Sequence, residues 1–364
     1  MRVGILGGGQ LGWMTILEGR KLGLSFWVLD KDPDAPASRV ADKWFPPERC
    51  REFAQGCEFI TYEFEHIEED ILEVVEEKLV PGAEPLRLKK RRSEEKGFLY
   101  KLGYPVPKFV GTDLEGLKQA VEKVGTPAVV KSEKLGYDGK GQYRVTSEED
   151  LEAIKKAHSE GDTFVVEEWV DFEAEVSVIG VRDSSGRIIT YPMTYNVHEE
   201  GILLYNRVAN FPDIEKEAVD IVSSLLEDLK IVGLLAVEFF LTSEGGLLIN
   251  EFAPRPHNTG HYTLDGAYTS QFENLLRAIL NLPLGSSALK VPSGMVNILG
   301  MSLSELNVED ILLVEGAKLY WYNKEKKPRR KVGHVNILTP SEEGLREGIR
   351  RLLQSIYHRE YSLI

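Results

Sequence analysis

Short apolar blocks alternate with charged blocks along the chain, and this pattern predicts an α/β protein. Near the start, Val3–Leu6 and Ser25–Leu29 are apolar runs of strand length, and Trp13–Leu22 between them has the spacing of a helix. Phe59–Glu65 is a further predicted strand, with Glu63 at its C-terminal end. This order is typical of an open sheet, in which ligands bind at the carboxyl ends of the strands.

The middle of the chain alternates strands with glycine-rich turns. Ser93 is expected to cap a helix that ends at Gly103–Pro105, because serine is a favoured N-cap residue. Thr126–Ser132 is the next predicted strand and carries Lys131, and Asp162–Val170 is a strand that ends in two acids. Lysine at the end of an apolar strand is commonly a rim residue, so Lys131 alone identifies no site.

Two apolar runs, Leu234–Leu241 and Leu247–Phe252, flank the polar turn Thr242–Gly246 and predict a β-hairpin. With the turn centred between positions 244 and 245, Glu238 and Glu251 face each other across the two strands. Opposed Cβ atoms lie roughly 4.5–5.5 Å apart, and like charges there are destabilising. Coulomb's law gives a repulsion of about 3 kcal/mol at an effective dielectric constant of ~20.

Such a carboxylate pair must be protonated, hydrated or bound to a cation. Mg²⁺ prefers oxygen ligands and is commonly held by one or two carboxylates together with phosphates and water. The following loop places Arg255, His257 and Asn258 where a phosphate and its metal would lie. The alternative is two solvated glutamates on the wet face of a sheet.

The C-terminal third contains a predicted helix over Phe272–Leu280 and a strand over Ser293–Leu299. A basic segment, Lys324–Lys331, precedes a last apolar strand and is either a phosphate site or a solvated hairpin. We expect three domains, at residues 1–90, 91–282 and 283–364, with a mobile lid at about 105–170.

Composition limits the classes of function. The 364 residues carry a formal net charge of −14, which argues against a surface for nucleic acid or anionic membranes. Cys50 and Cys57 match no metal or redox spacing. The sequence contains no run of ~18 apolar residues and no signal-peptide pattern at its start, so we expect a cytoplasmic protein that spans no membrane.

Gly7–Gly12 has the pattern G-x-G-x-x-G, and Asp30 follows 21 positions after Gly9. Three interpretations remain open. The turn could bind a dinucleotide, with Asp30 on a ribose, or one phosphate of another ligand at the helix N-terminus. It could also be a tight turn that only needs glycine.

A second glycine-rich segment, Gly136–Gln142, lies between two predicted strands. Its backbone N–H groups could fold over phosphates, and Lys140 would add charge. It is not a Walker A loop, because the residue pattern differs and strands rather than a helix flank it. A plain hairpin loop is the alternative.

The order of these features resembles that of the ATP-grasp enzymes. The segments G-G-G-Q-L-G from Gly7 and A-P-R-P-H-N-T-G-H-Y from Ala253 narrow the resemblance. Over nearly its full length the chain is similar to the N5-carboxyaminoimidazole ribonucleotide synthetases, which carboxylate a ribonucleotide in purine synthesis with ATP. The resemblance implies a Rossmann-like N-terminal sheet, a central ATP-grasp unit and a small C-terminal domain.

The resemblance also implies a role for each matching position. The positions near ATP are Arg92, Lys131, Gly136, Tyr137, Asp138, Gly139, Lys140, Gly141, Gln142, Glu167, Glu168, Trp169, Val170, Glu175, His198, Asn250 and Glu251. The metal ligands are Glu238 and Glu251, and the catalytic residues are Asp138, Arg255, His257 and Asn258. The positions near the ribonucleotide are Gly8, Gln10, Leu11, Glu63, Tyr137, Lys324 and Arg330. Strict alternation turns Asn250 to the opposite face from Glu251, so it is expected to act through its backbone or a bulge.

The implied reaction uses ATP, bicarbonate and 5-aminoimidazole ribonucleotide, with Mg²⁺ or Mn²⁺ as the metal and a homodimer as the assembly. Bicarbonate would attack the γ-phosphate to form carboxyphosphate, and the ribonucleotide amine would take up the carboxyl group or the released CO₂. ADP and phosphate would leave, and no protein nucleophile is required.

The chain departs from the family pattern at a few positions: Trp13 in place of Arg, Thr259 in place of Ser, Tyr262 in place of Trp, and Asn323 and Arg329 in place of Gly. The last departure leaves open which of Arg329, Arg330 and Lys331 meets the substrate phosphate.

Other functions also stay open at this point. A formate-dependent ribonucleotide transformylase or a biotin-carboxylase-like ligase would share the ATP site. An NAD-dependent dehydrogenase would use Gly7–Gly12 and Asp30 but leaves Glu238 and Glu251 unexplained. A nucleotide-binding module without activity would not need Lys131 and both glutamates.

Overall fold

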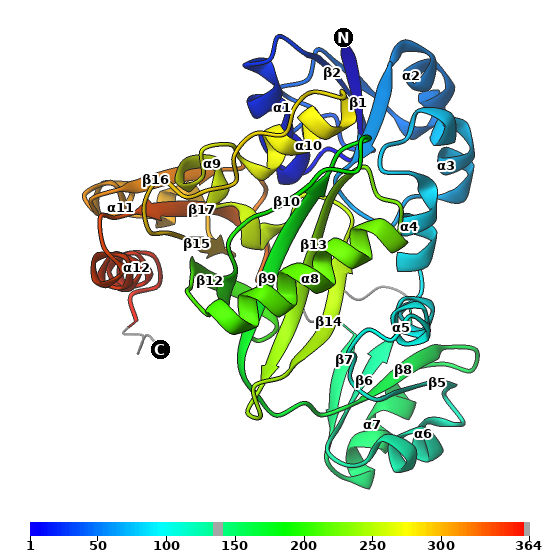
Figure 1. Ribbon diagram of the computed structural model, residues 1–364. Coiled ribbons are helices and arrows are strands. Elements are labelled where there is room, and N and C mark those ends of the chain that lie inside the picture. Colours follow the sequence, from blue (N-terminus) through cyan, green and yellow to red (C-terminus); the bar gives the residue numbers. More distant parts are fainter. Residues whose placement is uncertain (134–140, 360–364) are drawn as a thin grey trace.

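The computed structural model describes residues 1–133 and 141–359, whose strands form three sheets with helices packed on them (Figure 1). Two of the sheets have four strands and the third has nine. The predicted α/β class is therefore confirmed.

The first sheet is parallel and comes from the N-terminal quarter of the chain. Its strands are β1 (Arg2–Leu6), β2 (Ser25–Leu29), β3 (Lys43–Phe45) and β4 (Phe59–Tyr62), in the order β3-β2-β1-β4. Its helices are α1 (Gln10–Arg20), α2 (Cys50–Gly56), α3 (Glu69–Val75) and α4 (Ala83–Lys89). Since β1 and β4 are parallel neighbours, the glycine turn after β1 and Glu63 after β4 meet at one edge.

The second sheet is antiparallel and occupies the predicted lid region. Its strands are β5 (Phe109–Asp113), β6 (Ala128–Ser132), β7 (Gln142–Val145) and β8 (Thr163–Glu168), in the order β5-β8-β6-β7. Helices α6 (Leu117–Val124) and α7 (Glu148–Ala157) bury their apolar sides against it. Lys131 and Glu167 both lie on its other face, toward the rest of the molecule.

The nine-stranded sheet is antiparallel and extends from the hairpin to the C-terminal part. Its strands are β9 (Phe172–Arg182), β10 (Ile188–Thr190), β11 (Thr194–Glu199), β12 (Ile202–Val208), β13 (Gly233–Thr242), β14 (Leu247–Ala253), β15 (Ser293–Leu299), β16 (Ala317–Trp321) and β17 (Lys331–Leu338). The order is β14-β13-β9-β11-β12-β15-β17-β16, with β10 beside β9. Because β15 pairs with β12, residues after 283 extend the central sheet and do not form a separate one.

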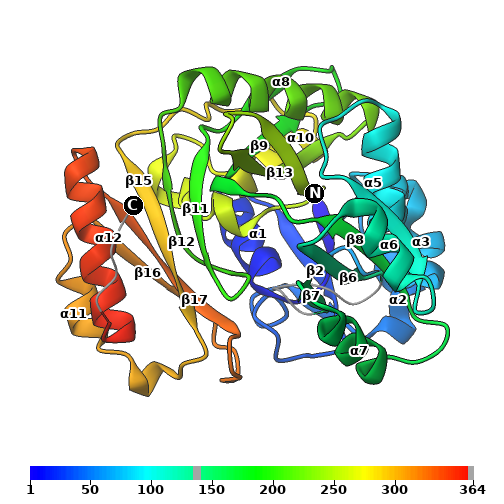
Figure 2. The same cartoon turned by 90° about the horizontal axis from the view of Figure 1, so that it is seen from below.

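The helices that cover this sheet explain which of its faces carries the chemistry. Helix α8 (Pro212–Asp228) packs on apolar residues such as Val176 and Val237. Strand alternation therefore turns Glu175, Ser177 and Glu238 to the opposite face. The remaining helices are α5 (Arg92–Lys101), α9 (Thr263–Gly266), α10 (Gln271–Ile279), α11 (Val308–Leu312) and α12 (Glu342–Tyr357). Seen from below, the lid strands and the C-terminal strands lie on opposite sides of α1 (Figure 2).

The predicted pairing of Glu238 with Glu251 is confirmed, and so is a bulge at Asn250, one of the two expectations for that residue. Leu241 pairs with Leu247, so the turn is centred on residue 244, half a residue earlier than predicted. A bulge at Asn250 adds one residue to β14 and restores the predicted register from Glu238 onward. The bulge also brings the Asn250 side chain to the Lys131 side of the strand.

The prediction that Ser93 caps a helix is wrong. Helix α5 begins at Arg92, with Arg91 in extended conformation as the N-cap residue. The Ser93 backbone N–H is satisfied by a carboxylate oxygen of Glu133 in the lid, at 3.0 Å. A distant acid therefore takes the place of a local cap, which a local sequence pattern does not reveal.

Candidate active site

One cavity of about 1270 Å³ collects side chains from all three predicted domains. The predicted site residues that line it are Gln10, Leu11, Glu63, Arg92, Lys131, Gln142, Glu167, Glu168, Trp169, Val170, Glu175, His198, Glu238, Asn250, Glu251, Arg255, His257, Asn258, Lys324 and Arg330. Gly8 and Gly141 are not among the lining residues. The predictions for Gly136, Tyr137, Asp138, Gly139 and Lys140 fall outside the described residues. A smaller hollow near Arg187 and Ser286 contains none of the candidates.

A buried cluster of charges joins the lid to the hairpin. The Lys131 Nζ lies 3.0 Å from Glu167 Oε2 and 3.4 Å from Asn250 Oδ1. Lys96, one helical turn after Arg92 on α5, donates to the Asn250 carbonyl at 2.8 Å and lies 3.5 Å from Glu167. Burial favours a raised pKa for Glu167, but the two lysines outweigh burial and lower it.

Lys96 is a functional candidate that the sequence reasoning missed. Its side chain is only 4% exposed, and burial lowers its pKa. The i, i+4 spacing from Arg92 would have placed it on the same helix face. Glu167 Oε1 is buried without a partner among the described residues, so this oxygen is available to a ligand.

Aromatic residues border the cavity beside the end of β8. The Arg144 guanidinium lies 4.2 Å from the centre of the Trp169 ring, and Phe172 stacks on Phe240 at 4.8 Å. All four residues line the cavity. Flat apolar surfaces at the border of a cavity suit a purine base.

The opposed glutamates of the hairpin have different electrostatic surroundings. Burial raises the pKa of Glu238 to about 7, and Glu251 adds to the rise while His198 opposes it. For Glu251, burial acts in the same direction, but Lys89 and Arg92 outweigh it and lower the pKa to about 2. One carboxyl group of the pair is therefore easily protonated, and the other stays ionised.

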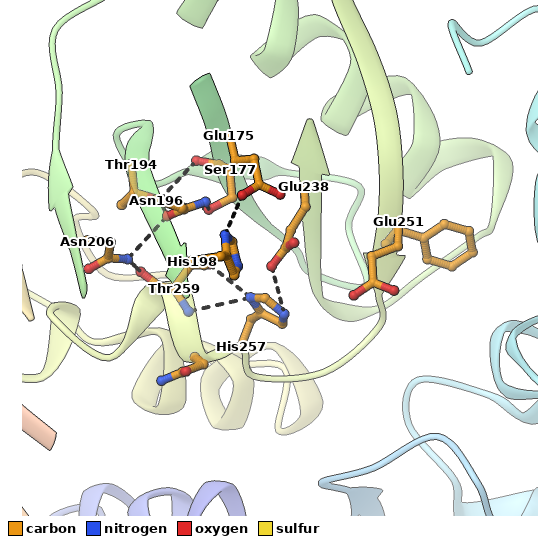
Figure 3. A network of polar contacts seen from close by, with 12 residues as sticks. Glu175, Ser177, Thr194, Asn196, His198, Asn206, Glu238, Glu251, His257 and Thr259 are labelled. Atoms are coloured by element: carbon orange, nitrogen blue, oxygen red, sulfur yellow. Dashed lines mark hydrogen bonds and ion pairs between the residues drawn. The ribbon is translucent and has the colours of Figure 1, made fainter. Parts of the chain in front are cut away.

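Two histidines flank Glu238 from different elements (Figure 3). His198 Nδ1 lies 2.6 Å from Glu175 Oε2, and this hydrogen bond raises the pKa of His198 although burial opposes it. His257 Nε2 lies 3.4 Å from Glu238 Oε1. Burial and the neighbouring Arg255 lower the pKa of His257 to about 3, so it is neutral at physiological pH.

The other two predicted catalytic residues are tied to different domains. Arg255 forms an ion pair of 2.9 Å with Glu65, which follows β4 of the N-terminal sheet. Asn258 exchanges two amide hydrogen bonds with Asn297 on β15, at 3.1 and 2.8 Å. The loop after β14 therefore connects the N-terminal and C-terminal parts at the cavity.

The glycine turn is filled by the protein's own carboxylates. Glu63 accepts hydrogen bonds from the Gly9 N–H and, at 2.9 Å, from the Gly12 N–H. Asp30 accepts from the Gly8 N–H at 2.7 Å. The dinucleotide interpretation is therefore wrong, because Glu63 occupies the position of a pyrophosphate and Asp30 closes the turn. The same three hydrogen bonds leave the Gly8, Gly9 and Gly12 N–H groups already used, so a single phosphate at this turn stays an untested alternative.

The basic C-terminal segment reaches the same cavity. Lys324 donates to the Gln10 side chain at the start of α1. Asn323 and Arg329 adopt positive φ angles of 54° and 64°, which explains why glycine is usual at these positions in the family pattern. Arg329 and Arg330 both line the cavity. Arg329 Nη1 lies 3.4 Å from Glu200 Oε2, and Arg330 donates to the Glu325 carbonyl.

The donor set fits a metal that shares its ligands with a nucleotide. Among residues 1–133 and 141–359, no group of three or more His, Cys, Asp and Glu side chains could hold a metal ion by itself. Two opposed carboxylates beside Lys131 and Arg92 match Mg²⁺, which would complete its shell with phosphate oxygens. In the described part of the chain, no helix has the length and apolar character needed to cross a bilayer.

Family profiles match three consecutive segments of the chain. Residues 1–89 match the ribonucleotide synthetase preATP-grasp domain, residues 97–272 the ATP-grasp domain, and residues 293–348 the phosphoribosylaminoimidazole carboxylase C-terminal domain. These matches agree with the predicted order of an N-terminal sheet, an ATP-grasp unit and a C-terminal domain.

Full-length relatives are similar over almost the whole chain. The N5-carboxyaminoimidazole ribonucleotide synthase of Aquifex aeolicus is 57% identical, with 97% of this chain and 96% of the relative covered. The crystal structure of the phosphoribosylaminoimidazole carboxylase ATPase subunit from Aquifex aeolicus has a TM-score of 0.87 and 53% identity, with 98% and 100% covered. The Aspergillus clavatus N5-carboxyaminoimidazole synthase, solved with ADP and 5-aminoimidazole ribonucleotide, has a TM-score of 0.90 and 29% identity, with 98% and 99% covered.

Proposed function

Because the chain belongs to the N5-carboxyaminoimidazole ribonucleotide synthase family of ATP-grasp enzymes, we propose that it carboxylates 5-aminoimidazole ribonucleotide with ATP and bicarbonate. The products are N5-carboxyaminoimidazole ribonucleotide, ADP and phosphate, as one step of purine synthesis. The observation that carries the proposal is the single cavity in which ATP-grasp residues meet the glycine turn and the basic segment from the two ends of the chain.

The proposed nucleotide site lies between the lid and the hairpin. The base would lie beside Trp169 and Phe240, with its polar edge against the backbone of Glu168–Val170, which line the cavity. Lys131 and Arg92 would hold the phosphates, because both cations line the cavity that also contains the hairpin glutamates. These interactions orient the γ-phosphate toward the loop at Arg255–Asn258.

The proposed ribonucleotide site lies across the cavity. Lys324 and Arg330 supply two cations for the 5′-phosphate, and Gln10 and Glu63 border the space in which the ribose would lie. Arg329 is assigned to Glu200 and not to the substrate. The amine of the ribonucleotide would then face the end of the triphosphate, where bicarbonate is activated.

The proposed metal is Mg²⁺, held by Glu238 and Glu251. When bound, it would neutralise charge on the phosphates and stabilise the phosphoryl transfer. Glu251 is suited to this role because Lys89 and Arg92 keep its carboxylate ionised. Arg255 would add positive charge at the reacting phosphate, while its pair with Glu65 fixes its direction. A homodimer and a cytoplasmic location stay predictions of the sequence.

Steady-state release of ADP tests the proposal. Release should be fast only when ATP, bicarbonate and 5-aminoimidazole ribonucleotide are all present. Equal rates without the ribonucleotide would contradict the assignment. A formate-dependent transformylase would instead be identified if formate replaced bicarbonate.

A further inference from the structure

His257 is held in place by uncharged, buried side chains that have no predicted role. Its backbone exchanges two hydrogen bonds with the Gln271 amide, which accepts from the His257 N–H at 3.0 Å and donates to its carbonyl at 2.8 Å. Gln271 is fully buried at the start of α10. These two hydrogen bonds fix the position of the His257 backbone independently of any ligand.

Thr259 fixes the ring of His257. Its hydroxyl lies 2.9 Å from Nδ1, and its backbone N–H donates to the same nitrogen at 3.4 Å. A backbone N–H can only donate, so Nδ1 must be an acceptor and carry no proton. Since Nδ1 carries no proton, the ring proton is on Nε2, the atom that lies 3.4 Å from Glu238 Oε1.

Thr259 is itself held from behind by a polar network on the large sheet (Figure 3). Asn206 on β12 donates to the Thr259 carbonyl at 2.7 Å. The side-chain amide of Asn196 accepts a hydrogen bond from Thr194 at 3.0 Å and donates one to Ser177 at 3.1 Å. The side-chain nitrogen of Asn206 lies 3.5 Å from the side-chain oxygen of Asn196.

The members of this network are at most 4% exposed and none of them is charged. The amide nitrogens of Asn196 and Asn206 have defined acceptors, which favours one geometry, although the side-chain oxygen of Asn206 is buried without a partner among the described residues.

We propose that Thr259, supported by Asn206 and Gln271, is a positioning residue that holds His257 in the Nε2–H tautomer. His257 then donates a hydrogen bond toward the Glu238 end of the cavity and cannot take up a proton there. The proposal rests on the proposed function only for the identity of the anion beside Glu238, which would be the reacting phosphate or bicarbonate. The other tautomer would place two N–H groups against each other at Nδ1.

The tautomer can be measured directly by NMR on the wild-type protein labelled with ¹⁵N-histidine. The chain has 7 histidines, and a spectrum of His257→Gln assigns the signal of interest by difference. The proposal expects a proton-bearing Nε2 and an unprotonated Nδ1 at neutral pH. A proton on Nδ1 would overturn it. This readout needs no turnover, so it stands or falls separately from the proposed reaction.

Variants of Thr259 test whether its contacts with the His257 ring matter for catalysis. Thr259→Val keeps the shape but removes the 2.9 Å bond, and kcat should fall about 10- to 100-fold, the usual effect of removing an orienting partner. The KM values for ATP and for the ribonucleotide should change less than about 3-fold. Thr259→Ser keeps the hydroxyl and should restore most of kcat.

Thr339→Val is a matched control, because Thr339 is also buried and its hydroxyl donates to the Ser341 carbonyl at 2.8 Å, far from His257 in the chain. It should leave kcat unchanged. Wild-type kcat in Thr259→Val, or an equal loss in Thr339→Val, would overturn the positioning role. If Thr259→Val does not fold, the wild-type NMR measurement still decides the tautomer. A loss of kcat in Thr259→Ser as large as that in His257→Gln would contradict the positioning role of the Thr259 hydroxyl.

Discussion

The glycine turn of the N-terminal sheet and the hairpin of the large sheet both carry acids next to a potential phosphate site, but they differ in what remains available to a ligand. In the turn, Glu63 and Asp30 accept hydrogen bonds from the backbone N–H groups that a phosphate would need. In the hairpin, Glu238 and Glu251 face each other and their neighbours compensate the charges unequally.

This difference shows that a motif predicts binding only if its hydrogen-bonding groups are unused in the fold. The glycine pattern is satisfied internally, so it supports the structure at the edge of the cavity. The opposed carboxylates keep a conflict of like charges that a cation would relieve. We therefore expect ligand binding at the hairpin, whose two strands carry no familiar short motif.

The largest expected effect comes from neutralising the hairpin acids. Glu251→Gln and Glu238→Gln should each lower kcat by about 10²- to 10³-fold, because each removes charge that positions the phosphoryl group and its metal. ADP release at saturating substrates measures this effect. Glu244→Gln, at the exposed turn of the same hairpin, is the control and should be unaffected. Wild-type rates in both active-site variants would place the metal elsewhere.

The next largest effect concerns the cations that face the glycine turn. Arg330→Ala and Lys324→Ala should each raise the KM for the ribonucleotide about 10- to 150-fold, from the loss of a charge-assisted contact worth ~1.5–3 kcal/mol. The KM for ATP should hardly change. Arg329→Ala is the matched variant and should have little effect, since Arg329 pairs with Glu200. A large effect of Arg329→Ala alone would exchange the assignments of the two arginines.

A smaller effect is expected when the glycine turn is emptied. Glu63→Ala leaves the Gly9 and Gly12 N–H groups without their acceptor and should lower the free energy of unfolding by about 1–2 kcal/mol. Urea unfolding measures this loss, and Glu63→Gln, which keeps one acceptor oxygen, should lose less. NADH should not bind the wild-type protein. Unchanged stability in Glu63→Ala would mean that the turn does not depend on Glu63.

The smallest expected effect concerns stability, which should change in opposite directions in Glu238→Gln and Glu251→Gln. The folded-state pKa of Glu238 is raised to about 7, so ionising it costs stability progressively from pH ~4.5 to 7. Glu238→Gln should therefore gain stability over wild type as pH rises through that window. Glu251 has a lowered pKa, so its charge stabilises the fold above pH ~4.5, and Glu251→Gln should be less stable at neutral pH. Melting temperatures between pH 5 and 8 measure both, and shifts of the same sign would contradict the unequal pair.

Much of this architecture could be predicted from periodicity. The strand Ser293–Leu299 has the bounds that were predicted. The two hairpin strands begin or end one residue away from the predicted bounds, except at Leu247, where the prediction is met. The candidate site residues were predicted from the family pattern, and most of those that the structure describes line one cavity. The contacts of Lys96 and the cap of α5 by Glu133 were not, because both depend on residues far apart in sequence.

The bulge at Asn250 shows a different limit. The sequence left a backbone role and a bulge as alternatives, because an apolar pattern does not show a register change of one residue. Only the structure shows that the bulge is present and brings Asn250 to Lys131. The Asn206–Thr259 network was missed because Asn, Ser and Thr in strands give no periodic signal. Only the structure shows that they meet behind His257.

The most direct test of the account is to follow ¹³C-bicarbonate by NMR while ADP is measured in the same reaction. With ATP and 5-aminoimidazole ribonucleotide, one labelled carboxyl group should appear on the ribonucleotide amine for each ADP formed, and Glu251→Gln should slow both signals together by about 10²- to 10³-fold. ADP formation without ¹³C in the ribonucleotide, or labelling at the wild-type rate in Glu251→Gln, would contradict a carboxylation that is driven by ATP at the hairpin.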